Sequence, residues 1–182
     1  SSIQVFYGVS ATTQGHDARA ILDVSKPEHR YTCRATRAGD PKVKALIQWT
    51  GEVSFTGAAD SGHKVVMDGP PEFGGRNRGC RPMELVLIGM GGCTAFDVVH
   101  ILRKGRQEVT DCVAEIDAER AETEPRVFTR IHVHFKVTGR NLDPRRVESA
   151  IRLSAEKYCS ASIMLGKTAT ITHDFEIVGV AA

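Results

Sequence analysis

Residues 83–102 constrain the fold of this chain most, because the run MELVLIGMGGCTAFDVVHIL is apolar on nearly every side. A helix that is apolar all round has to be covered by protein or by lipid. The uninterrupted apolar part, residues 85–96, is about 12 residues long, against the roughly 20 needed to cross a bilayer. Glu84, Asp97 and His100 lie at or within its ends. We therefore predict a helix buried in protein.

Cys93 lies in the middle of this segment and follows Gly91 and Gly92. Two adjacent glycines leave room for another backbone or a small molecule beside the thiol. Pro82 suits the first helical turn, and Gly105 follows two basic residues, as expected at a helix C-terminus. The segment has the features of a helix that shields a reactive thiol.

The composition is that of an ordinary globular protein, with 182 residues, 41% hydrophobic and 25% charged. Basic residues exceed acidic ones by two, and this excess falls within residues 1–42. A neutral remainder offers no basic patch for nucleic acid. Residues 1–42 are polar and weakly periodic, so we predict an N-terminal extension of unknown role before one domain at 43–182.

The five cysteines are odd in number and form no CxxC motif. This pattern indicates neither a secreted disulfide framework nor a zinc site. A reducing compartment fits better, and no signal peptide is visible at the N-terminus. We therefore expect a cytoplasmic protein with no membrane partner.

Short apolar runs bounded by turn residues predict six strands. They cover residues 43–50, 52–56, 63–67, 109–118, 127–137 and 168–178. The first three suggest an antiparallel meander, and a loop rich in Gly, Pro and Arg at 69–82 leads from them to the Cys93 helix. The order strands, helix, strands, helix, strand indicates an α+β fold.

A second helix is predicted to begin at Asp143 and Pro144, with Asp143 as N-cap and Leu142 packing on Val147 as a hydrophobic staple. Cys159 falls at the edge of its inner stripe, near its end. That stripe comprises Val147, Ala150, Ile151, Ser154, Ala155 and Tyr158. Two helices could therefore bring two sulfurs together.

Two motifs together resemble a known family. They are PMELVLIGMGGC, which ends at Cys93, and EKYCSASIML, which contains Cys159, 66 positions later. Both are similar to motifs of the OsmC/Ohr family of osmotically induced and organic hydroperoxide resistance proteins, over about residues 43–178. The runs RKGRQEVTDC and FTRIHVHFKVTGR are closest to the YhfA-like branch.

The resemblance implies an intertwined homodimer in which antiparallel sheets wrap two central helices. It also implies thiol peroxidase chemistry without metal, flavin or haem. Cys93 would attack an organic hydroperoxide, or hydrogen peroxide, and become a sulfenic acid, and Cys159 would resolve it to a disulfide. A dithiol of the lipoyl or thioredoxin type would then reduce the disulfide.

The sequence departs from the family pattern beside the first cysteine. In the peroxidases a glutamate directly follows the helix-starting proline and pairs with an arginine, whereas Met83 stands there in this chain. Glu84, one residue later and rotated by about 100°, is a candidate substitute. The candidate arginines are Arg34, Arg37, Arg76, Arg78 and Arg81.

Other constellations have simpler interpretations. Cys93, Asp97 and His100 share a helical stripe, but about 10 Å of rise separates Cys93 from His100, which favours an Asp97–His100 pair instead. His132 and His134 could hold a metal, although an alternating strand favours a solvent-facing role for them. Inert or exposed thiols are the simplest interpretation of Cys33, Cys80 and Cys112.

Three hypotheses follow. The first is a peroxidase of hydrophobic hydroperoxides in oxidative stress defence. The second is a non-catalytic dimer that senses redox state or binds a small ligand, which Met83 in place of the glutamate favours. The third is a structural dimer with vestigial cysteines.

Overall fold

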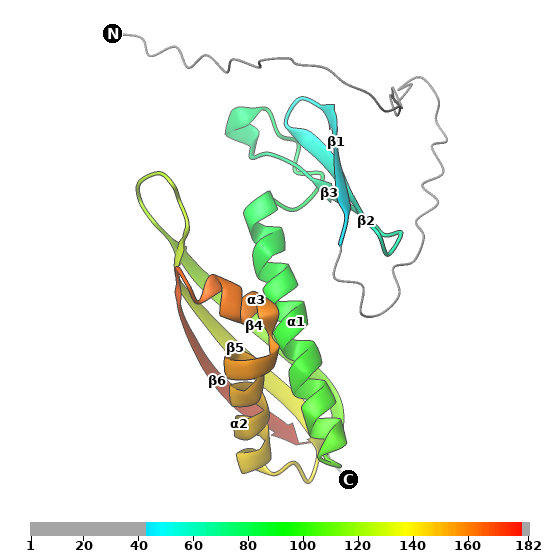
Figure 1. Cartoon of the computed structure of the whole chain (residues 1–182), viewed down its shortest axis with the longest axis vertical. Helices are drawn as coiled ribbons and strands as arrows, with labels where there is room; N and C mark the ends of the chain where they lie inside the picture. The colour runs from blue at the N-terminus through cyan, green and yellow to red at the C-terminus, as the bar shows by residue number, and fades with distance from the viewer. Residues whose placement is uncertain (1–42, 180–182) are drawn as a thin grey trace, which may run out of the picture.

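The computed structural model describes residues 43–179. The predicted extension, with Cys33, Arg34 and Arg37, lies outside the described residues. Figure 1 shows two small sheets connected by one long helix, with the other helices on the same face of the second sheet as that helix. This arrangement is the α+β fold that the order of elements predicts.

The first sheet has the order β1-β2-β3 and the second has the order β4-β5-β6. The strands are β1 (Ala45–Gly51), β2 (Ser54–Ala59), β3 (Lys64–Met67), β4 (Glu108–Arg120), β5 (Phe128–Arg140) and β6 (Thr170–Gly179). The helices are the short 3-10 turn η1 (Pro71–Phe73), α1 (Pro82–Lys104), α2 (Pro144–Leu153), the π-helical turn η2 (Ser154–Tyr158) and α3 (Ser160–Leu165).

The core lies between the second sheet and the helices. β5 alternates strictly, so that Ile131, Val133, Phe135 and Val137 are buried while the residues between them are more accessible. α1 and α2 cover this apolar face with the side chains Met90, Val98, Leu102, Val147, Ala150 and Ile151. Gly91 allows α1 to approach β4 closely, since a Cβ there would lie 2.8 Å from Cδ1 of Ile116.

The expectation of antiparallel sheets is wrong for β6. β4 and β5 are antiparallel, but β6 pairs in parallel with β5 along its length. The reason is the connection: α2 to α3 carry the chain back along the sheet, and a strand entered after such a crossover runs parallel to the one before it. The second sheet is therefore mixed.

Asp68 organises the loop that joins the first sheet to α1. Its side chain is buried, and its carboxylate accepts hydrogen bonds from the backbone N–H groups of Gly69, Arg76 and Arg78 at 2.9–3.0 Å. The bond from Arg78, with those from Arg76 and Gly69, lowers the pKa of Asp68 below its usual 3.8 against the opposing effect of burial. The Arg81 guanidinium adds to this effect and donates to the carbonyl of Asp68.

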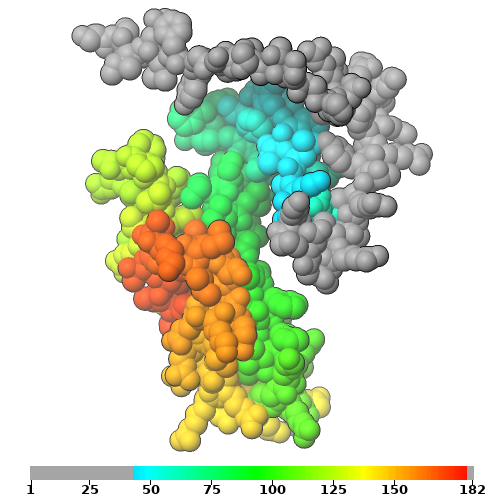
Figure 2. Space-filling view, viewed as in Figure 1, coloured from blue at the N-terminus to red at the C-terminus, as the bar shows by residue number. Residues whose placement is uncertain are grey.

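α1 begins at Pro82 and is closed by Gly105, as the sequence predicts. It is long and apolar enough to pass as a membrane span by length and composition, yet only 28% of its most apolar stretch is buried within the chain. Val86, Ile88 and Phe96 are 39%, 56% and 69% exposed. Figure 2 shows α1, in green, uncovered beside the orange helices. The described residues thus cover mainly one side of this helix.

We predict that Asp68→Asn lowers the melting temperature by several degrees at pH 7, because an amide replaces one of the two oxygens that receive three backbone donors. Since the folded-state pKa is lowered, the contribution of Asp68 is present above about pH 3.8 and is lost as the pH falls below that value. The difference in melting temperature between wild type and variant, measured by circular dichroism, should therefore become smaller in acid. Glu72→Gln, an exposed change in the same loop, is the control; equal melting temperatures for all three proteins would contradict this role.

Candidate redox site

Cys93 on α1 and Cys159, which directly precedes α3, come together on the inner side of the helices. Their sulfurs and a carboxylate oxygen of Asp97 all lie within 4.8 Å of one another. Both thiols are free in this structure. Cys159 is completely buried, whereas Cys93 is partly accessible. The two predicted sulfurs are therefore neighbours, with an acidic group beside them that the sequence interpretation had assigned to a pair with His100.

A buried hydrogen-bond network ties α1 to the π-helical turn next to this site. The Ser154 hydroxyl lies 2.9 Å from Oγ1 of Thr94 and donates to Oδ2 of Asp97 at 3.1 Å. Thr94 and Ser154 are both fully buried. Because buried polar groups are costly unless paired, this network fixes the carboxylate of Asp97 close to the sulfurs.

The π-helical turn sets the position of Cys159. The backbone N–H of Cys159 donates to the carbonyl of Ser154 at 2.8 Å, five residues earlier in the chain instead of the four of an α-helix. This wider turn places Ser154 and Cys159 on the same buried side and turns Tyr158 outward, where it is 50% exposed. The prediction that Tyr158 belongs to the inner stripe is wrong for this reason. Such π-helical insertions are frequent at functional sites.

Ser162 holds the sulfur of Cys159. Its backbone N–H donates to Sγ at 3.4 Å and its hydroxyl donates at 3.2 Å, so that Cys159 acts as the N-cap of α3. Ser154 and Ser162 were not singled out for these roles from the sequence. The motif around Cys159 contained them, but the hydroxyl contacts depend on the π-helical turn, which periodicity does not reveal.

The surroundings of Cys93 disfavour its thiolate. Burial, the adjacent Cys159 and the Asp97 carboxylate raise the pKa of Cys93 above its ordinary 9.0, and a hydrogen bond from the backbone of Ala161 opposes them. A thiol becomes a strong nucleophile when it is deprotonated. In the isolated chain Cys93 is therefore shielded and largely protonated at neutral pH.

Glu84 lies away from the sulfurs within one chain. It caps α1, since its carboxylate accepts the backbone N–H of Arg81 at 2.8 Å. Cys93 follows Glu84 by nine residues of helix. This spacing corresponds to about 13 Å of rise and places the two side chains on opposite sides of α1. Of the candidate arginines, Arg76 pairs with Glu52 at 2.6 Å and Arg81 hydrogen-bonds within its own loop.

The histidines singled out from the sequence occupy other places. His100 stacks on Phe96 with ring centroids 5.9 Å apart, while Asp97 is held by Ser154. His132 and His134 lie on the outer face of the second sheet and both contact the carboxylate of Asp174. This contact raises the pKa of His134. The outer face is thus a ladder of charged and polar side chains.

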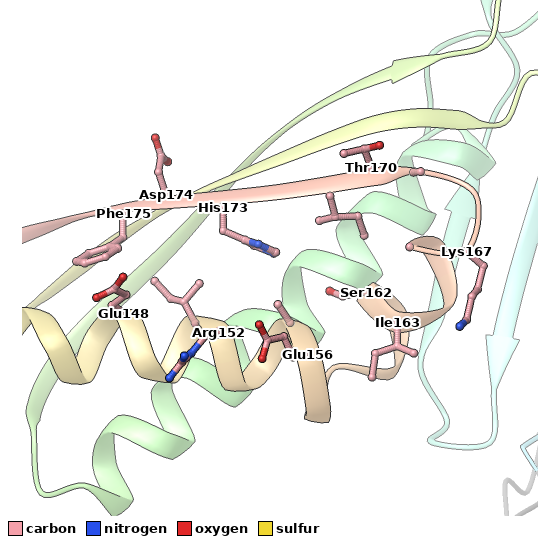
Figure 3. Close-up of a pocket in the computed structure, with 15 residues that line it drawn as sticks. Glu148, Arg152, Glu156, Ser162, Ile163, Lys167, Thr170, His173, Asp174 and Phe175 are labelled. Carbon is pink, nitrogen blue, oxygen red and sulfur yellow. The ribbon is translucent and has the colours of Figure 1, made fainter.

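A pocket of about 920 Å³ opens between β6 and the helices α2 and α3 (Figure 3). Its lining combines apolar side chains such as Ile151 and Phe175 with Arg152 and His173. Nε2 of His173 is buried without a hydrogen-bond partner among the described residues. Ser162, the donor to Cys159, also lines this pocket, whereas neither Cys93 nor Cys159 is among its lining residues.

The remaining described cysteines lie elsewhere. Cys80 lies near the end of the loop before α1 and forms a single β-bridge with Met67, the last residue of β3. Cys112 packs against the core from β4, and burial together with Asp111 raises its pKa. Neither belongs to the cluster around Cys93 and Cys159.

Comparisons with known proteins identify the family of this chain. Residues 75–174 match the model of the OsmC-like protein family. The chain is 47% identical to protein YhfA of Escherichia coli K12 over 136 residues, 75% of this chain and 98% of the relative.

Solved structures share the fold. A protein from Aquifex aeolicus is 27% identical with a TM-score of 0.69, over 78% of this chain and 100% of that one. An organic hydroperoxide resistance protein OsmC from Legionella pneumophila is 17% identical with a TM-score of 0.59, over 74% and 96%. The predicted kinship to the YhfA-like branch is confirmed, and this chain belongs to the OsmC family.

Proposed function

We propose that this protein is a thiol-dependent peroxidase that reduces organic hydroperoxides through Cys93 and Cys159. The observation that carries the proposal is the meeting of two free thiols within 4.8 Å on separate helical elements. Membership of a family whose structural relatives include organic hydroperoxide resistance proteins supports a redox role. The partly apolar pocket that Ser162 lines supports the binding of a hydrophobic molecule near Cys159.

The reaction needs two steps. The Cys93 thiolate attacks one peroxide oxygen, breaks the O–O bond and releases the alcohol after protonation, leaving a sulfenic acid. The Cys159 thiol then displaces the hydroxyl of the sulfenic acid as water and forms the disulfide. An external dithiol supplies two electrons and two protons to restore both thiols. Cys93 is assigned the first step because it is the more accessible of the two residues.

The working unit in this proposal is a homodimer. α1 exposes an apolar side that includes Ile88 and Phe96, and Ile47 and Trp49 on the first sheet are 58% and 64% exposed. A three-stranded sheet needs packing against another layer for stability. A second copy of the chain would cover both surfaces at once, including the side of α1 that residues 43–179 leave exposed.

A slower, non-catalytic role in redox sensing or ligand binding is the second candidate. Two observations favour it: the raised pKa of Cys93, and a large pocket with an unpartnered His173 nitrogen. A sensor is oxidised once and stays oxidised, whereas a peroxidase is reduced by a dithiol and reacts again. Turnover therefore distinguishes the two functions.

We predict that one equivalent of cumene hydroperoxide converts the fully reduced protein to a Cys93–Cys159 disulfide, detected by peptide mass mapping. Dihydrolipoamide should reverse it, and repeated cycles should consume peroxide. Cys93→Ser should abolish peroxide consumption, and Cys159→Ser should trap the sulfenic acid. Cys112→Ser is the matched control and should behave as wild type. Survival of both thiols would contradict the proposal, and a single oxidation without turnover would favour the sensor.

The pH dependence of Cys93 follows from its raised pKa. Because only the thiolate reacts, alkylation of Cys93 by iodoacetamide should be slow at pH 7, rise about tenfold per pH unit, and continue to rise beyond pH 9.0. Asp97→Asn removes one of the charges that raise this pKa and should accelerate alkylation modestly at pH 8. Asp111→Asn, beside Cys112, should leave Cys93 unchanged. A rate that levels off well below pH 9 would contradict this description.

A further inference from the structure

The three potential ligands around Cys93 have the donor set of a metal site. Two cysteine sulfurs and one carboxylate oxygen lie within 4.8 Å of one another, the one such group of three found among residues 43–179. Zinc binds thiolate sulfur at about 2.3 Å and carboxylate oxygen at about 2.0–2.2 Å, so tetrahedral ligand atoms stand roughly 3.4–3.8 Å apart. A small side-chain adjustment would bring the three donors to that spacing.

We infer that reduced Cys93, Asp97 and Cys159 together bind one Zn²⁺ ion. Cys93 and Asp97 are four residues apart on α1, which places them on one side of the helix, and the π-helical turn supplies Cys159 from the opposite direction. These three ligands would leave the fourth tetrahedral position of the ion for water. Three protein ligands with one open position is the arrangement of reactive zinc centres.

Supporting contacts hold two of the three donors. Asp97 accepts from Ser154, which is itself hydrogen-bonded to Thr94, and the sulfur of Cys159 accepts from the backbone and hydroxyl of Ser162. Groups of this kind orient metal ligands and are as much a part of a metal site as the ligands themselves. They also reduce the reorganisation that ion binding requires.

The charge of the donor groups favours the binding of a cation between Cys93, Asp97 and Cys159. The carboxylate of Asp97 lies within 4.8 Å of both sulfurs and supplies one negative charge at the site. A thiol that coordinates a divalent cation loses its proton, so Cys93 and Cys159 would each add a negative charge when the ion binds. Binding of Zn²⁺ by two thiols releases two protons, and the mixed sulfur and oxygen donors suit zinc rather than magnesium or calcium.

Zinc binding would mask the thiols proposed to react with peroxide. The ion-bound protein keeps both sulfurs reduced and blocks Cys93, whereas a disulfide offers no thiolate ligand. Metal occupancy and thiol oxidation are thus mutually exclusive states of one site. The binding itself does not depend on peroxidase activity, since it needs only the reduced donors.

The test is a competition titration of the reduced, metal-free full chain with Zn²⁺ against a chromophoric chelator. We expect one ion per chain, and at least a tenfold loss of affinity in Cys93→Ser, Cys159→Ser and Asp97→Asn. Asp111→Asn and Cys112→Ser are matched controls and should bind as wild type. Equal binding by the Asp97→Asn variant, or by either serine variant, would overturn the site.

A second measurement guards against variants that fold poorly. In the wild-type protein, Zn²⁺ should protect Cys93 and Cys159 from alkylation while leaving Cys80 reactive, as mapped by mass spectrometry. Co²⁺ in place of Zn²⁺ should produce a sulfur-to-cobalt charge-transfer band that the diamide-oxidised protein lacks. Alkylation of Cys93 at an unchanged rate in saturating Zn²⁺ would overturn the inference without any peroxide assay.

Discussion

The burial of α1 is the constraint on which the rest of this structure depends. A helix that is apolar on nearly every side needs cover on every side, and residues 43–179 provide it mainly on one. The second sheet and α2 cover the side that carries Met90, Val98 and Leu102. The other side, with Ile88 and Phe96, remains exposed. Residues 43–179 therefore leave part of this apolar helix without cover.

The same helix determines the chemistry of the site. Cys93 and Asp97 project from α1 toward the one interruption in the helical segment opposite, where the π-helical turn brings Cys159 to meet them. Burial favours neutral thiols, the serine hydroxyls fix the acceptor atoms, and the carboxylate adds negative charge. This environment holds two thiols close together and raises the pKa of Cys93. The proposed oxidation by peroxide and the inferred binding of a cation would both use this pair of thiols.

Much of this was predictable from the sequence because local signals were strong. Pro82 and Gly105 mark the ends of α1, Asp143 caps α2 through the N–H of Arg145, and the alternation in β5 separates its buried and accessible faces. The pairing of Cys93 with Cys159 came from the two motifs. The sequence interpretation assigned no zinc site because the cysteines form no CxxC motif, whereas the donors of the inferred zinc site come from separate elements.

The remaining features depend on interactions that periodicity does not encode. The parallel pairing of β6 follows from the direction of the crossover, and the outward position of Tyr158 follows from one extra residue in a turn. Asp97 was expected to pair with His100, yet the buried hydroxyl of Ser154, 57 positions away, takes that role. Glu84 was a candidate to act beside Cys93, but its carboxylate caps the start of α1, nine residues before Cys93.

The most direct test of the account is the molar mass of the protein in solution, measured by light scattering on a sizing column. A second copy covering α1 predicts twice the 19.8 kDa of one chain. Phe96→Asp should then shift the mass toward that of one chain with its helical circular dichroism retained, while Arg145→Asp, on the exposed start of α2, should not. A wild-type protein that elutes as a monomer at micromolar concentration would contradict the account.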